Sequence, residues 1–348
     1  MRFTTSKTSR RVALGAMAIA ASALLLAGCA AATPAPGGAG DGGDDASSIT
    51  VIPKSLGNKY FEASGKGAKE AAEELKQDLT EAGPTAAGSA DQVPFIQTAI
   101  QTGQKAIVIA ANDPTAVCND LGAAQDAGIK VVAFDTDTNC RDVFVNQATV
   151  DGIGQGLVDL LVEHLGPEGG TIAFLSGGAN AANLNAWLES MTAIIEADHP
   201  EITIAKTAYG DDVDEKAYQE AQGLMQSIPD LDAIIAPDTI SVKEAAHYLS
   251  VTPEFQGKVW VTGLGLPSEM AEYVNSGVVE KFGLWNPEDL GYLASYAADA
   301  LVKGTITGAE GDKFEAGKLG EYTVGKDGEI VLGPLFVFDK ANVGDFAF

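Results

Sequence analysis

The chain has 348 residues, of which 48 are acidic and only 22 are basic, so its formal net charge is −26. A surface of this sign repels phosphate backbones and anionic lipid, which argues against nucleic-acid binding. The length suffices for two medium domains, and no segment after the first thirty residues is long and apolar enough to cross a membrane.

The first predicted elements are a leader and a stalk. Two arginines precede an apolar run that ends in the letters LAGC at Cys29. This pattern resembles a bacterial lipoprotein signal, with an uncleaved transmembrane anchor as the alternative and the export route, twin-arginine or general, left open. We expect residues 1–28 to be a signal peptide and Cys29 to carry the lipid. Residues 29–48, which are rich in Ala, Gly, Pro, Asp and Ser, are predicted to form a flexible stalk.

From Ile49 onward, short β-rich runs alternate with longer helical patterns. In the first half, strands are expected at 49–54, 106–111, 131–137 and 142–147, with helices at 60–79 and 113–127. The pattern then restarts with helices at 152–165, 186–197, 215–227, 242–249, 268–275 and 290–303. The strands of that half are expected at 171–177, 202–209, 233–238, 259–265 and 279–285, followed by a β-rich tail at 330–338. Apolar strands separated by helices predict an α/β fold with parallel sheets, built either as one barrel or as two open sheets.

Polar and aromatic residues gather at or just beyond the carboxyl ends of the predicted strands. They are Asn58, Asp113, Asp135, Asp137, Asn183, Asp238 and Trp285. Ligands bind at this edge in open α/β sheets and in barrels alike, so the pattern predicts a binding site without distinguishing the two architectures.

The remaining cysteines, Cys118 and Cys140, form an even pair in a chain with an export signal, which predicts a disulfide, with two buried thiols as the alternative.

The three histidines form no spaced cluster, so no metal site is expected. A glycine run at 152–156 lacks the third glycine of a dinucleotide loop, and no cofactor is expected. An acid/base glycosidase using Asp135 and Asp238 is the remaining enzyme alternative.

An ordered set of short motifs resembles the ribose-binding-like class of periplasmic sugar-binding proteins of ABC importers, especially the rhamnose-binding and autoinducer-2-binding proteins. The motifs are IPK (52–54), GNKYFE (57–62), QVPFI (92–96), ANDP (111–114), FDTD (134–137), VNQ (145–147), NLNAW (183–187), YGDD (209–212), APD (236–238), FGLWNP (282–287) and GKLGEYT (317–323).

The resemblance implies two Rossmann-like lobes of the type I periplasmic binding protein fold, with the ligand between them. Lobe one would comprise 49–146 plus 286–308, and lobe two 147–285 plus 309–348, with the chain crossing near Asn146, Trp285 and Gly308. The ligand-binding residues implied are Lys54, Asn58, Tyr60, Phe61, Asp113, Asp135, Asp137, Asn183, Asn185, Pro237, Asp238 and Trp285.

The implied function is that of a lipid-anchored monomer at the outer face of the cytoplasmic membrane. It would capture a sugar, L-rhamnose or a related deoxysugar, and deliver it to the permease of an ABC importer without acting as an enzyme. Autoinducer-2, for uptake or signalling, is the alternative ligand. Leu184 stands where autoinducer-2 binders carry a glutamine, which favours a deoxysugar. Gly265 stands where ribose binders usually carry an aspartate, which argues against ribose itself.

The lipid anchor gives the first prediction. Because the Cys29 sulfur would carry the lipid, Cys29→Ser should release the protein into the medium or leave it unprocessed, as measured by cell fractionation and intact mass. Ala31→Ser is the matched control and should stay anchored. Normal processing and membrane retention of Cys29→Ser would contradict the lipoprotein interpretation.

Overall fold

The computed structural model describes residues 47–348. The expected signal peptide, the lipidation at Cys29 and most of the stalk lie outside these residues. The stalk was expected to run through residue 48, but Ser47 is already buried and its hydroxyl lies 3.5 Å from Asp299 Oδ1. Ser47 and Ser48 therefore belong to the folded part of the chain, unlike the expectation from composition. The described residues belong to one unit, which is described by itself below.

The first sheet holds six parallel strands in the order β13-β5-β4-β3-β1-β2. Their bounds are β1 (Ser48–Ile52), β2 (Asp78–Glu81), β3 (Ala106–Ile109), β4 (Lys130–Phe134), β5 (Val143–Asn146) and β13 (Glu329–Val331). Residues of β3 and β5 are buried throughout, as their continuous apolar sequences require when helices cover both faces. The edge strand β2 was not predicted, because its sequence DLTE carries no apolar run.

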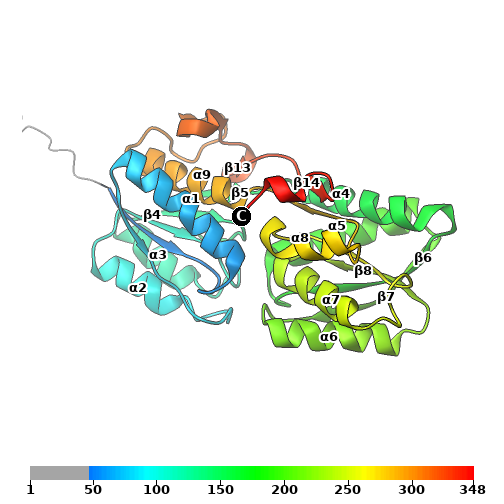
Figure 1. Ribbon diagram of the computed structural model, residues 1–348. Helices are drawn as coiled ribbons and strands as arrows, with labels where there is room; N and C mark the ends of the chain where they lie inside the picture. The colour runs from blue at the N-terminus through cyan, green and yellow to red at the C-terminus, as the bar shows by residue number, and fades with distance from the viewer. Residues whose placement is uncertain (1–46) are drawn as a thin grey trace, which may run out of the picture. The chain divides into compact units, whose positions relative to one another are not determined.

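Four helices belong with this sheet: α1 (Lys59–Leu75), α2 (Val93–Gln101), α3 (Cys118–Asp126) and α9 (Pro287–Val302). Helix α1 was expected to reach residue 79 but ends at Leu75, where Lys76 adopts a left-handed conformation with φ of 55°. Helices α1 and α9 pack side by side (Figure 1). A Cβ on Gly67 would lie 1.7 Å from the Glu288 carbonyl oxygen, so only glycine allows this close approach.

The second sheet has four parallel strands in the order β7-β6-β8-β9. They are β6 (Gly170–Ser176), β7 (Ile202–Tyr209), β8 (Leu231–Ala236) and β9 (Trp260–Gly263). Helices α4 (Val150–Leu165) and α5 (Ala182–Asp198) pack together on one face, and α6 (Asp214–Ser227) and α7 (Thr239–Val251) on the other (Figure 1). Two separate sheets exclude the barrel and confirm the predicted α/β fold with parallel sheets.

The remaining elements connect the two sheets or lie at their edges. Helix α8 (Pro267–Ser276) precedes β10 (Lys281–Leu284), which pairs antiparallel with β14 (Phe336–Asp339). Strands β11 (Lys313–Glu315) and β12 (Glu321–Thr323) form a small antiparallel pair. No helix within residues 47–348 is long and apolar enough to span a membrane.

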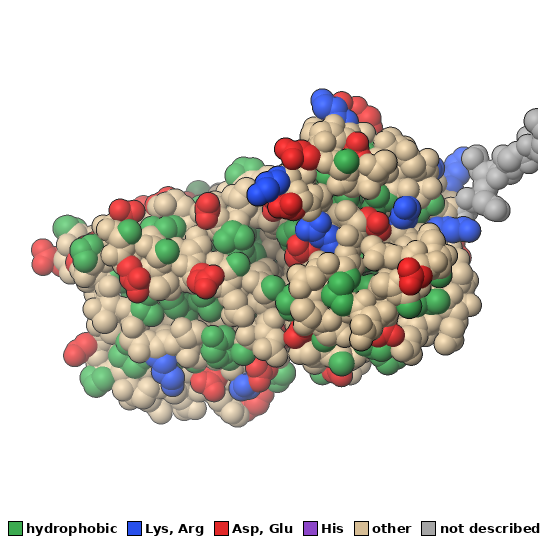
Figure 2. Space-filling model, turned by 180° about the vertical axis from the view of Figure 1, so that it is seen from behind, with side chains coloured by type: hydrophobic (Ala, Val, Ile, Leu, Met, Phe, Trp, Pro, Cys, Tyr) green, Lys and Arg blue, Asp and Glu red, His purple; other side chains and the backbone are tan. Residues whose placement is uncertain are grey.

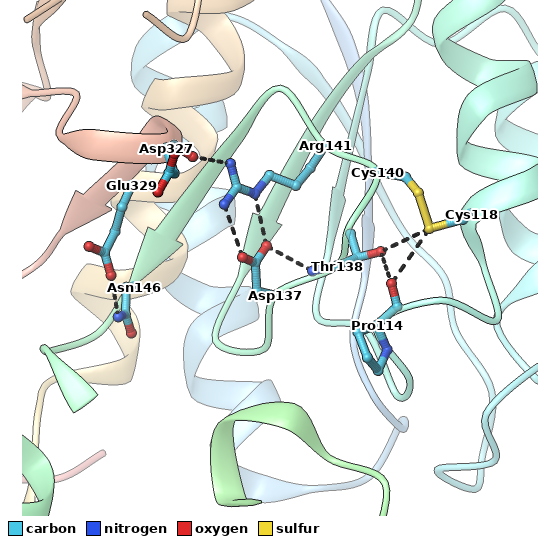
Figure 3. A network of polar contacts seen from close by, with 9 residues as sticks. All are labelled: Pro114, Cys118, Asp137, Thr138, Cys140, Arg141, Asn146, Asp327 and Glu329. Carbon is cyan, nitrogen blue, oxygen red and sulfur yellow. Dashed lines mark hydrogen bonds and ion pairs between the residues drawn. A yellow bond between two sulfur atoms is a disulfide. The ribbon is translucent and has the colours of Figure 1, made fainter. Parts of the chain in front are cut away.

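The tail departs from the predicted lobe boundaries. Residues 309–348 were assigned to lobe two, with a crossing near Gly308, but β13 pairs with β5 in the first sheet and only β14 joins β10. The Asn146 amide donates to Glu329 Oε1 over 2.7 Å and helps to hold β13 at this edge (Figure 3). The third crossing therefore lies between β13 and β14. A three-residue strand carries too little pattern for the sequence to reveal its partner.

The predicted pairing of Cys118 with Cys140 is confirmed: the two cysteines are joined, with their Cα atoms 5.4 Å apart (Figure 3). Cys118 begins α3, and Cys140 lies in the loop between β4 and β5. The bond thus ties a helix to the loop that follows a central strand.

The disulfide gives the second prediction. The two half-cystines are 22 residues apart, and loop-closure entropy assigns about 3 kcal/mol of folding free energy to such a cross-link. Cys118→Ser and the double variant Cys118→Ser/Cys140→Ser should lose similar stability in denaturant unfolding, because either change removes the same bond. Peptide-resolved thiol labelling of unfolded, unreduced wild-type protein should find neither cysteine free, and full labelling of both would contradict the disulfide.

Candidate functional site

A cavity of about 430 Å³, counting space open to solvent, lies where loops from the two sheets meet. Most of its lining follows the carboxyl ends of parallel strands or the first turns of the next helices, the usual position of ligand sites in open α/β sheets. The residues that line it are Lys54, Asn58, Tyr60, Phe61, Asp135, Asn183, Leu184, Trp187, Asp212, Pro237, Asp238, Thr239, Leu264, Leu284 and Trp285.

A buried ion pair lies in this lining. Lys54 follows β1 and Asp135 follows β4, and the Lys54 Nζ lies 3.6 Å from Asp135 Oδ2 with both side chains less than a tenth exposed. Lys54 also donates to Asn183 Oδ1 over 3.3 Å, which joins the first sheet to helix α5. Asp135 adopts a left-handed conformation with φ of 60°, and Thr136 donates its hydroxyl to Asp135 Oδ2. A buried charge needs such partners, and a strained backbone at this position is typical of functional sites.

Aromatic rings form one wall of the cavity. The indole N–H of Trp285 donates to the Tyr60 hydroxyl over 2.9 Å, and the two rings meet edge to face. Trp187 packs against Trp285 with ring centroids 5.8 Å apart, and Phe61 packs against Tyr60. Burial and the nearby Asp135 carboxylate raise the pKa of Tyr60 well above its ordinary value, so the phenol stays neutral. Flat, fixed rings of this kind can contact the apolar C–H face of a sugar.

Two further carboxyl groups come from the second sheet. Asp238 caps α7 by accepting a hydrogen bond from the Ser241 N–H over 2.8 Å. Its other oxygen, Oδ2, is enclosed and finds no hydrogen-bond partner among the described residues. Burial and the neighbouring Asp212 raise the pKa of Asp238 to about 7, and burial also raises the pKa of Asp212. A cavity with a cation, several carboxyl groups and an unpartnered acceptor is suited to a neutral ligand that carries several hydroxyl groups.

Nine of the twelve predicted ligand-binding residues line this cavity: Lys54, Asn58, Tyr60, Phe61, Asp135, Asn183, Pro237, Asp238 and Trp285. Asn58 also caps α1 by accepting from the Tyr60 N–H, so capping and lining coincide there.

The other three predicted residues, Asp113, Asp137 and Asn185, lie outside the cavity. Asp113 accepts from the Thr115 and Ala116 N–H groups, which lower its pKa and order its turn. Asp137 forms a two-bond ion pair with Arg141 at 2.9 and 3.0 Å (Figure 3). Asn185 donates to the Ala179 carbonyl oxygen.

Sequence reasoning missed five lining residues: Trp187, Asp212, Thr239, Leu264 and Leu284. The sixth residue outside the predicted set, Leu184, lies at the position that the resemblance used to choose between the two ligands. Asp212 and Trp187 belong to the motifs YGDD and NLNAW, so the motifs identified the segments without identifying these side chains. The leucines have no polar signal, because apolar lining residues cannot be told from core residues in a sequence. Within residues 47–348 no cluster of three or more His, Cys, Asp or Glu side chains could hold a metal ion.

Acidic side chains are scattered over the face drawn in Figure 2, as the net charge of −26 leads one to expect. Basic side chains lie among them.

Comparisons with known proteins agree on one kind of protein. A family profile described as "Periplasmic binding protein domain" matches residues 49–306. The crystal structure of a sugar ABC transporter from Actinomyces odontolyticus is 44% identical, with a TM-score of 0.71, and the match covers 87% of this chain and 98% of that one. An ABC transporter solute-binding protein from Clostridium phytofermentas with bound L-rhamnose is 35% identical, with a TM-score of 0.83 and the same coverage.

Two more distant matches complete the comparison. LsrB from Clostridium saccharobutylicum in complex with AI-2 is 26% identical, with a TM-score of 0.80 over 86% of this chain and 100% of that one. The ribose import binding protein of Escherichia coli is 22% identical over 256 residues, which are 74% of this chain and 85% of that protein.

The raised pKa of Asp238 gives the third prediction. Between pH 3.8 and about 7 the folded state binds the Asp238 proton more tightly than the unfolded state, so this group makes stability fall as pH rises. Its slope is at most about 1.4 kcal/mol per pH unit. Asp238→Asn keeps a helix-capping side chain but cannot ionise, so unfolding by denaturant at a series of pH values should show a smaller decline.

Asp113→Asn serves as the control for this experiment. The pKa of Asp113 is lowered, so its stabilising effect is present above its unfolded pKa and is lost only at lower pH. This variant should keep the wild-type slope between about pH 4.5 and 7. An identical slope in Asp238→Asn and wild type would show that Asp238 titrates at its ordinary pKa.

Proposed function

The chain belongs to the periplasmic binding protein family, and on this premise we propose that it is an extracytoplasmic binding protein that captures a sugar for the permease of an ABC importer. The observation that carries the proposal is the cavity itself. One small space lies between the two α/β halves of the chain, each half being one parallel sheet with its helices. It is lined by a paired lysine, three carboxyl groups and an aromatic wall. Such a lining supplies directed hydrogen bonds for hydroxyl groups and flat surfaces for a ring.

We take the ligand to be L-rhamnose or a related deoxysugar. Beside its polar groups, the cavity has an apolar part that includes Leu184, Leu264 and Leu284, each nearly inaccessible to solvent. A methyl group gains free energy when it is buried against leucines, whereas a hydroxyl group there would lose its hydrogen bonds. The similarity to the L-rhamnose-bound protein from Clostridium phytofermentas supports this choice.

Autoinducer-2 is the second candidate, supported by the similarity to LsrB in complex with AI-2. Leu184 weighs against it, since a leucine cannot provide the hydrogen bonds of the glutamine that autoinducer-2 binders carry there. The small, hydroxylated furanosyl ligand would then meet an apolar surface in place of a polar one.

Ligand capture would close the two halves onto the sugar. The cavity takes its lining from both sheets, so a ligand can contact all of these residues only when the halves are close together. A ligand that contacts the closed state more extensively shifts the population toward it. The closed form would be the one presented to the permease by a monomer that is lipid-anchored at the outer face of the cytoplasmic membrane.

The fourth prediction tests this function by calorimetry. Wild-type protein should bind L-rhamnose more tightly than L-mannose, which differs by a hydroxyl on the methyl carbon, by roughly tenfold or more because that hydroxyl would be buried without a partner. Autoinducer-2 should bind more weakly than L-rhamnose. Asp135→Asn, which tolerates the left-handed backbone, should weaken L-rhamnose binding by roughly tenfold or more through the loss of a charged acceptor.

Asp137→Asn is the matched control, because Asp137 lies two residues further on and binds Arg141 outside the cavity. This variant should keep the wild-type affinity. Tighter binding of autoinducer-2 than of L-rhamnose would favour the second candidate, and conversion of the sugar during the titration would overturn the assignment as a binding protein.

A further inference from the structure

A second cavity adjoins the first and is larger, about 580 Å³ counting space open to solvent. Its walls are two loops that face each other, residues 87–89 from the first half and residues 178–181 from the second. The side chains of these loops are small, and the Asn180 amide lies 3.5 Å from the Ser89 hydroxyl. The proposed monosaccharide site does not account for this space.

The two cavities share two lining side chains. Lys54 and Asp212 line both of them, so a ligand held in the first cavity lies beside the second. The loop that carries Asp212 is strained, because Asp211 and Asp212 both adopt left-handed conformations with φ of 54° and 56°. Glycine at position 177 makes room for it, since a Cβ there would lie 2.4 Å from Asp212 Oδ1. Backbone strain of this kind is typical of segments that serve a ligand site.

Asn112 carries a buried polar atom, unpartnered in the described part of the chain, beside the second cavity. Its side chain is nearly fully buried, and its amide nitrogen donates to the carbonyl oxygens of Lys54 and Gly88 over 3.0 and 3.3 Å. Two acceptors on one side fix the orientation of the amide. Its Oδ1 atom then has no hydrogen-bond partner among residues 47–348, although Asn112 lines the cavity. A buried carbonyl oxygen without a partner calls for a donor from a ligand or solvent.

We propose that the second cavity is a subsite for a second sugar ring, so that the ligand class includes deoxysugar disaccharides and glycosides. The inference rests on the proposed function, with the deoxysugar ring in the first cavity and the next ring between residues 87–89 and 178–181.

The charges at the subsite define the second ring further. Asp211 and Asp212 line it, and Asp211 is paired with Lys216. The one lining cation, Lys54, is engaged by Asp135 and Asn183. An acidic or phosphorylated substituent would therefore find no unpaired cation in this lining. The small side chains at positions 87, 88, 179 and 181 leave backbone groups within reach of an uncharged, hydroxylated ring.

The fifth prediction uses calorimetry with L-rhamnose, methyl α-L-rhamnoside and a set of L-rhamnose disaccharides that differ in the hydroxyl carrying the second ring. At least one disaccharide should bind wild-type protein with an affinity within about tenfold of L-rhamnose or tighter. Ala87→Phe fills the second cavity and should weaken that disaccharide by about tenfold or more, leaving L-rhamnose affinity unchanged. Ala86→Phe, on the exposed neighbouring residue outside the cavity, is the matched control.

Ala179→Phe fills the same space from the facing loop and keeps the test decisive if one variant does not fold, as judged by thermal unfolding. If L-rhamnose binds and no disaccharide does, the second cavity is filled by solvent and is not a subsite. The proposed function would then still stand. Equal weakening of both ligands by the filling variants would also overturn it. Failure of L-rhamnose itself to bind would count against the proposed function.

Discussion

The structure of the site depends on the neutralisation of one buried cation. Lys54 lies in a cavity with little access to water, and an ammonium group there is stable only while Asp135 and Asn183 surround it. Lys54 and its two partners come from separate elements: the end of β1, the end of β4 and the start of α5. The need to pair Lys54 therefore fixes the left-handed turn at Asp135 and draws α5 of the second half toward the first sheet, which leaves the remaining carboxyl groups facing the ligand space.

The sequence predicted those parts of the site that carry a polar residue directly after an apolar strand. Lys54, Asp135 and Asp238 are of this kind, and the alternation of strands and helices predicted the parallel sheets. Asp137 has the same signal as Asp135, two positions away in one motif, but Arg141 binds it outside the cavity. A sequence cannot show which of two neighbouring carboxylates has a local partner.

Other features escaped prediction because they depend on distant contacts. Strand β13 has only three residues, and its place beside β5 is decided by backbone pairing and by the bond between Asn146 and Glu329. Leu264 and Leu284 belong to apolar strand ends, where only the tertiary arrangement separates a cavity wall from the core. The length of α1 was overestimated because nothing in the helical sequence pattern indicates the left-handed conformation of Lys76 that ends the helix.

The disulfide has a consequence for ligand recognition as well as for stability. Cys140 lies five residues after Asp135, so the cross-link to α3 restrains the loop that leaves the binding cavity. The conformational freedom of this loop is lost when the protein oxidises and folds, and little remains to be lost when the sugar arrives. Preorganisation of this kind couples affinity to the redox state of the compartment. A molecule matured under reducing conditions would recognise the same sugar with a more mobile Asp135 and hence a larger entropic penalty.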